Sequence, residues 1–271
     1  MHVGALAIYP LKSGRQVALT SMLLDRFGPA GDRRWMLVDG DGRFITQRTH
    51  PRLCLITASL IPSSLERGDV LLQAPGQPDL RVVPTGLEQL PVRVWGDQVV
   101  AQAISPAADA WCSAFLQMPV RLVWMSATTH RAVNPGYAGI GHHTGFSDGF
   151  PLLLVTQSSL DHLNALLPSP VDWRRFRPNI VISGELPPHA EDGWKRLQIG
   201  DVELAVVKPC SRCVIPSIDP DTADKNSQIL TVMRTYRAGA DGKTYFGQNV
   251  VITRKPPGAC LDLGAPVQIL A

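Results

Sequence analysis

A succession of short apolar segments fills the first 105 residues, and this pattern constrains the fold more than any other feature of the chain. Most of the segments alternate in polarity or are rich in β-branched residues, and turn residues bound them, which is typical of strands. A tight hairpin is indicated by Asp-Gly-Asp-Gly at residues 39–42 and a second one by Gly96-Asp97. The predicted strands are 3–9, 17–24, 34–38, 43–47, 54–60, 70–73, 80–83, 92–95 and 99–103.

The rest of the chain mixes helical and strand periodicity. We expect a helix over 105–117 with Pro106 at its first position, one from a capping box at 158–161 to Leu167, and one over 228–237. Residues 126–149 form a polar, glycine-containing connecting segment without clear periodicity. The sequence therefore predicts a β-rich α+β chain. Further strands are predicted at 151–156, 179–183, 197–199, 202–207, 244–253 and 267–270.

Charge and composition exclude several kinds of partner. The 271 residues contain 26 Lys and Arg and 23 Asp and Glu, a formal charge of +3, without a basic stripe that would follow a nucleic-acid backbone. No apolar run is long enough for a membrane span, and the N-terminus lacks a basic leader. The five cysteines are sparse and odd in number, which does not suit a disulfide framework. We therefore expect a cytoplasmic protein with reduced thiols that binds neither nucleic acid nor membrane.

The segment Lys-Pro-Cys-Ser-Arg-Cys at 208–213 is the strongest chemical signal. Neighbouring cations favour the thiolate, which is the form that binds metals or attacks as a nucleophile. A zinc site would need two further ligands at suitable spacing, and a redox dithiol would open a helix, whereas Pro216 and turn residues follow here. Two packed cysteines are the third interpretation, but they leave the flanking cations without a purpose.

Cations at the ends of predicted strands form a second signal. Guanidinium groups suit phosphate oxygens, and hydroxyl and amide groups supply the remaining hydrogen bonds. Taken together, these side chains predict a cradle for an anionic ligand beside a thiolate. The candidates are Lys12, Arg33, Arg177 and Arg212, with Ser13, Asn179 and Ser211.

Several segments, in this order, resemble one protein family. They are Ile-Tyr-Pro-Leu-Lys-Ser at 8–13, Asp-Arg-Arg-Trp at 32–35, Ile-Thr-Gln-Arg at 45–48, Pro-Arg-Leu at 51–53, Phe-Ser-Asp-Gly-Phe-Pro at 146–151, Phe-Arg-Pro-Asn at 176–179, Cys-Ser-Arg-Cys at 210–213, Asp-Pro-Asp-Thr at 219–222 and Phe-Gly-Gln-Asn at 246–249. The chain resembles the MOSC family, and most closely those members, such as the amidoxime-reducing component and its bacterial relatives, that carry an N-terminal MOSC-type β-barrel domain. The resemblance implies that this barrel, residues 1–120, packs against a C-terminal MOSC β-barrel with a few helices, residues 121–271.

The resemblance also implies a molybdenum cofactor and a role for each candidate residue. In the family the second cysteine of the pair ligates the metal, which makes Cys213 the metal ligand and catalytic residue and Cys210 a structural one. Soft thiolate ligation suits the metal. The other implied cofactor-binding residues are Lys12, Ser13, Arg33, Arg177 and Asn179 for the pterin and phosphate, Ser211 and Arg212 for direct contact, and Gln248 and Asn249 for closing the site.

The implied activity is reduction of N-hydroxylated compounds, such as amidoximes, hydroxylamines and N-hydroxylated bases, to amidines or amines. Relatives with an iron–sulfur domain carry several more cysteines than the five of this chain. The resemblance therefore implies that electrons come from a separate donor protein with flavin, haem or an iron–sulfur cluster. His142 and His143 are candidate proton donors. Two departures from the family are Gly149-Phe150, where relatives have Thr-Ser, and Asn249, where some have tyrosine.

Two alternatives remain at this stage. One is a carrier of the cofactor or of sulfur, with Cys213 as persulfide or cofactor ligand, because MOSC domains also occur attached to cofactor sulfurases. Such enzymes use a separate pyridoxal-phosphate domain, so pyridoxal phosphate is a family-level possibility for which we expect no room here. The other is a binding module without metal chemistry.

Overall fold

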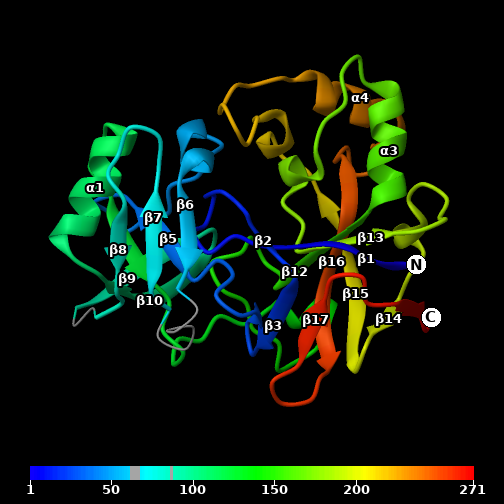
Figure 1. The fold of residues 1–271 in the computed structure, drawn as a ribbon, viewed down its shortest axis with the longest axis horizontal. Coiled ribbons are helices and arrows are strands. Elements are labelled where there is room, and N and C mark those ends of the chain that lie inside the picture. Colours follow the sequence, from blue (N-terminus) through cyan, green and yellow to red (C-terminus); the bar gives the residue numbers. More distant parts are fainter. Residues whose placement is uncertain (62–67, 86–87) are drawn as a thin grey trace.

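The computed structural model describes residues 1–61, 68–85 and 88–271, and it arranges them as two regions side by side (Figure 1). One region holds the helix α1 and two of the small sheets, which contain β5–β11 and are drawn in blue, cyan and green. The other holds the largest sheet, the remaining long helices and both chain ends. No helix among the described residues has the length and apolar character that crossing a bilayer requires.

The largest sheet has eight strands and takes two of them from the start of the chain. Its order is β18-β14-β15-β16-β12-β13-β1-β2, with β12 and β13 parallel. The Val3 N–H donates to Ala265 O at 2.9 Å and the Val267 N–H to Met1 O at 3.2 Å, so β1 also joins the segment that leads into β18 and the sheet curls round on itself. The strands are β1 (His2–Ile8), β2 (Val17–Leu19), β12 (Leu152–Thr156), β13 (Ile180–Ser183), β14 (Arg196–Ile199), β15 (Val202–Ser211), β16 (Tyr245–Arg254) and β18 (Val267–Ile269).

Three smaller sheets complete the fold. The four-stranded one has the order β5 (Trp35–Val38), β11 (Arg121–Trp124), β10 (Asp97–Ala103) and β9 (Gln89–Val94). One three-stranded sheet joins β6 (Thr57–Leu60), β7 (Val70–Gln73) and β8 (Leu80–Val82), and the other joins β17 (Cys260–Asp262), β3 (Ser21–Asp25) and β4 (Gly28–Pro29). The largest sheet and the sheet β17-β3-β4 therefore take strands from both halves of the chain, and a domain boundary at residue 120 stays a prediction.

The helices begin where the sequence supplies a cap. Ser105 Oγ accepts the N–H of Ala108 at 3.2 Å at the start of α1 (Pro106–Leu116), and Pro106 loses nothing there because its position needs no N–H donor. Thr156 caps α3 (Gln157–Leu166) in the same way. The other helices are α2 (Pro135–Ala138), α4 (Gln228–Arg237) and the 3₁₀ turns η1 (Pro51–Leu55), η3 (Trp173–Phe176), η4 (Ala190–Asp192) and η5 (Ile215–Ser217).

The large sheet is buried on both faces. Its inner face encloses an aliphatic cluster that includes Val3, Leu6 and Ile8 of β1. Its outer face packs under α3 and α4, where the rings of Phe176 and Phe246 stack with centroids 4.1 Å apart. Each buried aliphatic or aromatic side chain contributes about 1.5–3 kcal/mol. The strands that carry the cavity described below are thus held rigidly.

The strand-rich α+β class is confirmed, and the hairpins at 39–42 and at Gly96 form as predicted. The predicted strand 17–24 is wrong in one respect, because the chain changes partner at Thr20: β2 pairs with β1, while β3 pairs with β17 and β4. The predicted strand 54–60 begins as the turn η1, since Pro51 favours a helical first position. The strand at 43–47 does not form. Arg43 and Phe44 make only isolated bridges before a turn closes at Thr46.

Two further corrections concern the second half. β15 does not end at Val207 but continues to Ser211, because its partner β16 is equally long, so Cys210 and Ser211 lie in the strand rather than after it. The cap of α3 is Thr156, whose Oγ1 accepts the N–H of Ser159 at 3.3 Å, and not the predicted Ser158. The elements that the sequence pattern missed are β4, β11, β17 and α2.

Candidate functional site

A cavity of about 590 Å³ lies among the loops at the ends of β1, β5, β12 and β15. It contains every predicted site residue except Gln248. Its described lining thus brings together positions from residue 12 to residue 249, drawn from both regions of the molecule. The predicted residues that line it are Lys12, Ser13, Arg33, Arg177, Asn179, Ser211, Arg212, Cys213 and Asn249.

The charge of the lining is strongly one-sided. Asp148 is the one carboxylate among the described lining residues, against eight lysine and arginine side chains. Cations that converge on a concave surface concentrate the field there and favour an anionic ligand. The eight cations are Lys12, Arg33, Arg48, Arg177, Lys208, Arg212, Arg234 and Lys243.

Tyr9 organises one end of the cavity. The Arg33 and Arg177 guanidinium carbons lie 4.3 and 4.2 Å from the centroid of its ring, so the two cations share one aromatic support. Arg33 Nη1 donates to Asp32 Oδ2 at 2.6 Å and to Asn179 Oδ1 at 3.1 Å. Burial, together with the charge of Arg33, lowers the pKa of Arg177 to about 10. The Arg177 Nη1 atom donates to Gly14 O at 2.6 Å, while its Nη2 atom is buried without a partner.

Strained backbone is concentrated at this site. Of the seven described non-glycine residues with positive φ, four line the cavity. Left-handed backbone costs a non-glycine residue about 1–2 kcal/mol, and such strain gathers at functional sites. The four are Ser13 (φ 65°), Arg33 (φ 45°), Trp95 (φ 57°) and Arg177 (φ 57°).

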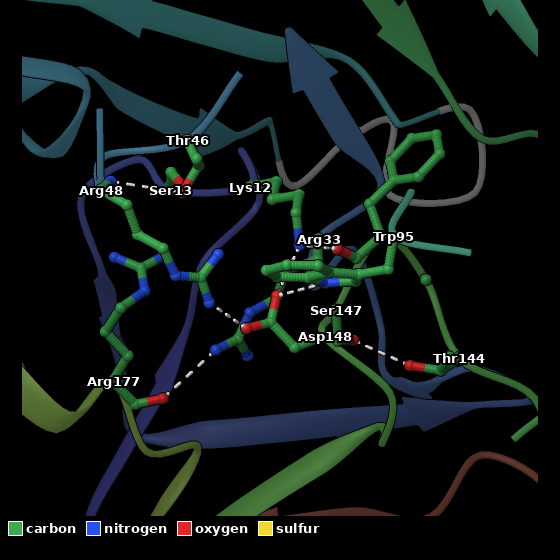
Figure 2. Close-up of polar contacts among 12 residues, drawn as sticks. Lys12, Ser13, Arg33, Thr46, Arg48, Trp95, Thr144, Ser147, Asp148 and Arg177 are labelled. Atoms are coloured by element: carbon green, nitrogen blue, oxygen red, sulfur yellow. Dashed lines mark hydrogen bonds and ion pairs between the residues drawn. The ribbon is translucent and has the colours of Figure 1, made fainter. Parts of the chain in front are cut away.

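Lys12 and Asp148 form a close ion pair in the same cavity (Figure 2). Lys12 Nζ donates to Asp148 Oδ1 at 2.7 Å and to Phe146 O at 2.6 Å. Burial lowers the pKa of Lys12 to about 8, although the Asp148 charge opposes that change. Desolvation by the surrounding cavity walls disfavours ionised Asp148, but Lys12 and Arg48 outweigh it and hold the pKa of this carboxyl well below its usual range. Asp148 is therefore ionised at neutral pH, and its side chain is 59% exposed.

The two cysteines of the pair face different arginines. Arg48 Nε donates to Cys213 Sγ at 3.2 Å, and Arg212 Nη1 donates to Cys210 Sγ at 3.1 Å. Both thiols are free and half-buried. Among residues 1–61, 68–85 and 88–271, no group of three or more His, Cys, Asp and Glu side chains could hold a metal ion. Cys210 lies in a strand rather than at a helix start, which disfavours a thioredoxin-like dithiol.

Gln248 and Asn249 lie on opposite sides of β16. The Gln248 Nε2 amide donates to Asp192 Oδ1 at 2.7 Å, and the side chain is buried away from the cavity. Asn249 lines the cavity, and its amide donates to Lys208 O at 3.2 Å. Alternation along a strand points neighbouring side chains to opposite faces, so only one of this pair can reach the ligand.

Sequence reasoning assigned no role to three residues that shape the cavity. Arg48 and Asp148 lie in segments that carried the family resemblance, which was the available signal for them. Trp95 had no signal beyond its place in a hairpin turn. The structure brings its ring to 4.4 Å from the Arg48 guanidinium carbon and its Nε1–H to 3.2 Å from Asp148 Oδ1 (Figure 2).

Comparison with known proteins gives consistent matches over the chain. Sequence models of the MOSC N-terminal beta barrel domain and the MOSC domain match residues 1–119 and 141–268. Mitochondrial amidoxime-reducing component 1 of Homo sapiens is 34% identical over 289 residues, which cover 99% of this chain and 82% of that protein. The Mus musculus protein of the same name gives the same identity and coverage. Molybdenum cofactor sulfurase of Oryza sativa subsp. japonica is 30% identical over 271 residues, 91% of this chain and 32% of that protein.

The two domain matches together cover most of the chain, and the relatives align along nearly its whole length. Seven of the nine segments that carried the sequence resemblance contribute residues to this one cavity, the exceptions being 51–53 and 219–222. This chain belongs to the MOSC family, with an N-terminal MOSC β-barrel domain followed by a MOSC domain.

Proposed function

We propose that this chain is a molybdenum-cofactor oxidoreductase that reduces N-hydroxylated compounds to amidines or amines with electrons from a separate donor protein. One observation carries the proposal. The cavity that contains the Cys213 thiol also contains two buried guanidinium nitrogens without hydrogen-bond partners, Arg177 Nη2 and Arg212 Nε. A buried cationic donor without an acceptor is costly, so its presence points to an anionic ligand.

These residues fit the molybdenum cofactor. Arg33, Arg177 and Lys12 offer the cations and Ser13 and Asn179 the neutral groups that a pterin with a phosphate requires, and Cys213 offers a soft thiolate for the metal. Ser211, Arg212 and Asn249 complete the set. Gln248 would make no direct contact with the cofactor and would act only by holding Asp192 in place. When bound, the cofactor would supply the two-electron chemistry of the metal.

The protein's own residues would bind the substrate and manage its protons. Reduction of an N–OH group to N–H releases water and consumes two protons. Lys12 Nζ holds a proton with a pKa of about 8, so it is charged at neutral pH yet able to release that proton. The ionised Asp148 oxygens would accept hydrogen bonds from the N–H groups of an amidoxime. His142 and His143 do not line the cavity, so the geometry does not favour them as proton donors.

The names of the relatives support the substrate class. Amidoxime reduction is stated in the names of the human and mouse proteins, and we extend it to this chain because the match covers nearly all of it. An external electron donor and a cytoplasmic location remain proposals. The human and mouse relatives are mitochondrial by name, so they do not support the cytoplasmic assignment.

A carrier of the cofactor or of its sulfur is the second candidate. The observation that favours it is the similarity to the rice molybdenum cofactor sulfurase over 91% of this chain. In that case Cys213 would hold a persulfide or ligate the cofactor in transit. The match spans 32% of the rice protein, and pyridoxal-phosphate binding finds no support from it.

Replacement of Cys213 by serine tests the proposal. Protein from a host that synthesises the cofactor is assayed for benzamidoxime reduction with reduced viologen, for molybdenum by mass spectrometry and for pterin by fluorescence. Since loss of residues that merely support a metal ligand costs about 10–100-fold, Cys213→Ser should cost more than about 100-fold. Cys260→Ser, an exposed thiol outside the cavity, is the matched control and should keep full activity.

Three outcomes distinguish the candidates. Wild-type protein without molybdenum, or full activity of Cys213→Ser, would contradict the oxidoreductase proposal. Molybdenum and pterin without benzamidoxime reduction would favour a carrier. Cyanide-labile sulfur that disappears in Cys213→Ser would identify a persulfide and favour the sulfur carrier in particular.

A further inference from the structure

Arg48 lies in the N-terminal half of the chain, and its guanidinium group contacts the thiol of Cys213 in the C-terminal half. Its Nε donates to Cys213 Sγ at 3.2 Å. Its Nη2 donates to Asp148 Oδ2 at 3.0 Å, and its guanidinium carbon lies 4.4 Å from the centre of the Trp95 ring (Figure 2). We infer that Arg48 is a positioning residue that holds the Cys213 sulfur and the Asp148 carboxylate in one fixed arrangement. This inference rests on the proposed function, because it takes Cys213 as the metal ligand.

The backbone that presents Arg48 is itself fixed. Thr46 closes a turn, since its carbonyl oxygen accepts the N–H of Thr49 at 3.1 Å and of His50 at 2.9 Å. Its Oγ1 accepts the Arg48 N–H at 3.3 Å and the Ser13 hydroxyl at 3.5 Å. The turn therefore ties Arg48 to the loop that carries Ser13. A fixed starting point lets the side chain set the position of what it contacts.

An ordinary surface ion pair does not account for this geometry. The Arg48 side chain is 20% exposed, and three parts of its guanidinium group contact three different partners. Exposed ion pairs are held loosely and contribute little. Here the contacts link a thiol, a carboxylate and an indole from three separate segments of the chain. Such a junction fixes relative positions, which a single ion pair cannot do.

The chemistry of this junction calls for arginine. A hydrogen bond to a ligating sulfur fixes the direction of its lone pairs and tempers its donation to the metal, as groups that support metal ligands generally do. Only a planar guanidinium group offers an Nε–H and an Nη–H in a rigid fork, so it can bond sulfur and carboxylate at once. A lysine would keep the charge near Asp148 but could not preserve both bonds in this geometry.

The test compares Arg48→Ala and Arg48→Lys with the same changes at Arg52. Arg52 lies four positions later in the turn η1 and stacks on Phe115 at 4.7 Å, as Arg48 stacks on Trp95, but it does not line the cavity. It is therefore a matched stacked arginine without the thiol. The measurements are molybdenum per pterin, the electron paramagnetic resonance spectrum of partly reduced protein, and the crystal structure of the cofactor-free variants.

We expect pterin content within twofold of wild type in all four variants. Molybdenum per pterin should fall about tenfold in Arg48→Ala, and Arg48→Lys should not restore it, in line with the usual cost of losing a group that supports a metal ligand. The molybdenum signal retained by the Arg48 variants should shift. Cofactor-free Arg48→Ala should show the Cys213 and Asp148 side chains displaced, whereas Arg52→Ala should show neither effect.

Wild-type behaviour of Arg48→Lys, or an equal loss in Arg52→Ala, would overturn the inference. So would unmoved Cys213 and Asp148 side chains in the crystal structure of Arg48→Ala. The crystallographic measurement does not depend on the cofactor. Wild-type protein without molybdenum would therefore contradict the proposed function, while the structure of the variant would still decide the positioning role.

Discussion

At the scale of single residues, the cavity holds arginine side chains whose hydrogen-bonding capacity the protein itself does not fully satisfy. Arg177 Nη2 and Arg212 Nε are buried without acceptors, and burial lowers the pKa of both Lys12 and Arg177. A buried unpaired donor costs about 1–3 kcal/mol. An anion that reached these groups would recover that free energy, which links ligand binding to stability.

Phosphate should therefore stabilise the cofactor-free protein. At equal ionic strength, replacing chloride by phosphate at about ten times its dissociation constant adds about 1.4 kcal/mol, and this raises the melting temperature by about 2–4 °C. The variant Arg177→Met should lose most of this increase, because it removes the unpartnered guanidinium. Arg254→Met, at an exposed arginine paired with Glu203, serves as control. The same phosphate effect in Arg177→Met would contradict the assignment of this anion site.

His189 predicts a loss of stability in acid. Burial and the charge of Arg237 lower its pKa from 6.5 to about 4, while Asp192 opposes them and His162 adds to them. Between pH 4 and 6.5 the unfolded chain therefore binds a proton that the folded protein does not, so this residue's contribution to stability falls as pH falls through that window. Thermal melts at pH 7 and pH 5 should show a smaller difference in His189→Asn than in wild type. Asparagine suits the position because His189 has a φ of +62°. An unchanged pH difference would contradict this prediction.

At the scale of elements, the contact between β12 and β16 depends on a glycine. Gly247 has a φ of +74°, and a Cβ placed there would lie 2.7 Å from Leu154 O. Gly76 has the same φ, but a Cβ placed there would meet nothing within 4 Å. The pair separates the backbone requirement from the close approach of two strands.

The two alanine variants should therefore differ in stability. We expect Gly76→Ala to lower the free energy of unfolding by about 1 kcal/mol, because only the left-handed backbone is affected. Gly247→Ala should lower it by about 3 kcal/mol, because β16 must also move away from β12. Since Asn249 lies two positions further along β16, this variant should also lose pterin. Denaturant unfolding measures the free energy of unfolding of both variants. Equal losses of stability in the two variants would show that the close contact between β12 and β16 does not matter.

At the scale of the whole molecule, the two ends of the chain meet in one sheet, as Figure 1 shows for the N- and C-termini. β1 supplies Val3, Leu6 and Ile8 to the core of the large sheet, and β3 pairs with β17 near the C-terminus. The cavity also takes residues from both halves, because Lys12, Arg33 and Arg48 come from the first half and Cys213 from the second. Fold and site therefore depend on the same association.

A fragment of residues 121–271 should not fold alone. It lacks β1, so β13 would lose one of its two partners and expose an apolar edge, which favours aggregation. Co-expression with residues 1–120 should restore soluble protein, because the missing strands can then be supplied in trans. Size-exclusion chromatography and thermal melting measure the result. A soluble fragment with a cooperative melt would contradict the prediction.

Local patterns were enough to predict the class of the fold, most of the strands and the helices, and the family, because alternation, capping residues and short motifs are local signals. Nine of the ten predicted site residues line one cavity. The assignment of Gln248 could not be checked locally, since its direction depends on the register of β16 against β12.

The tertiary structure alone decided which distant groups meet. Arg48, Trp95 and Asp148 lie in three loops, and no local pattern connects residues 48, 95 and 148 with the thiol of Cys213. The strand partners of β1 and β3 were also beyond reach, because a strand's sequence records its buried face but not the identity of its neighbour. Long-range packing determines that neighbour, and here the same packing brings Arg48 of the N-terminal half to the Cys213 thiol of the C-terminal half.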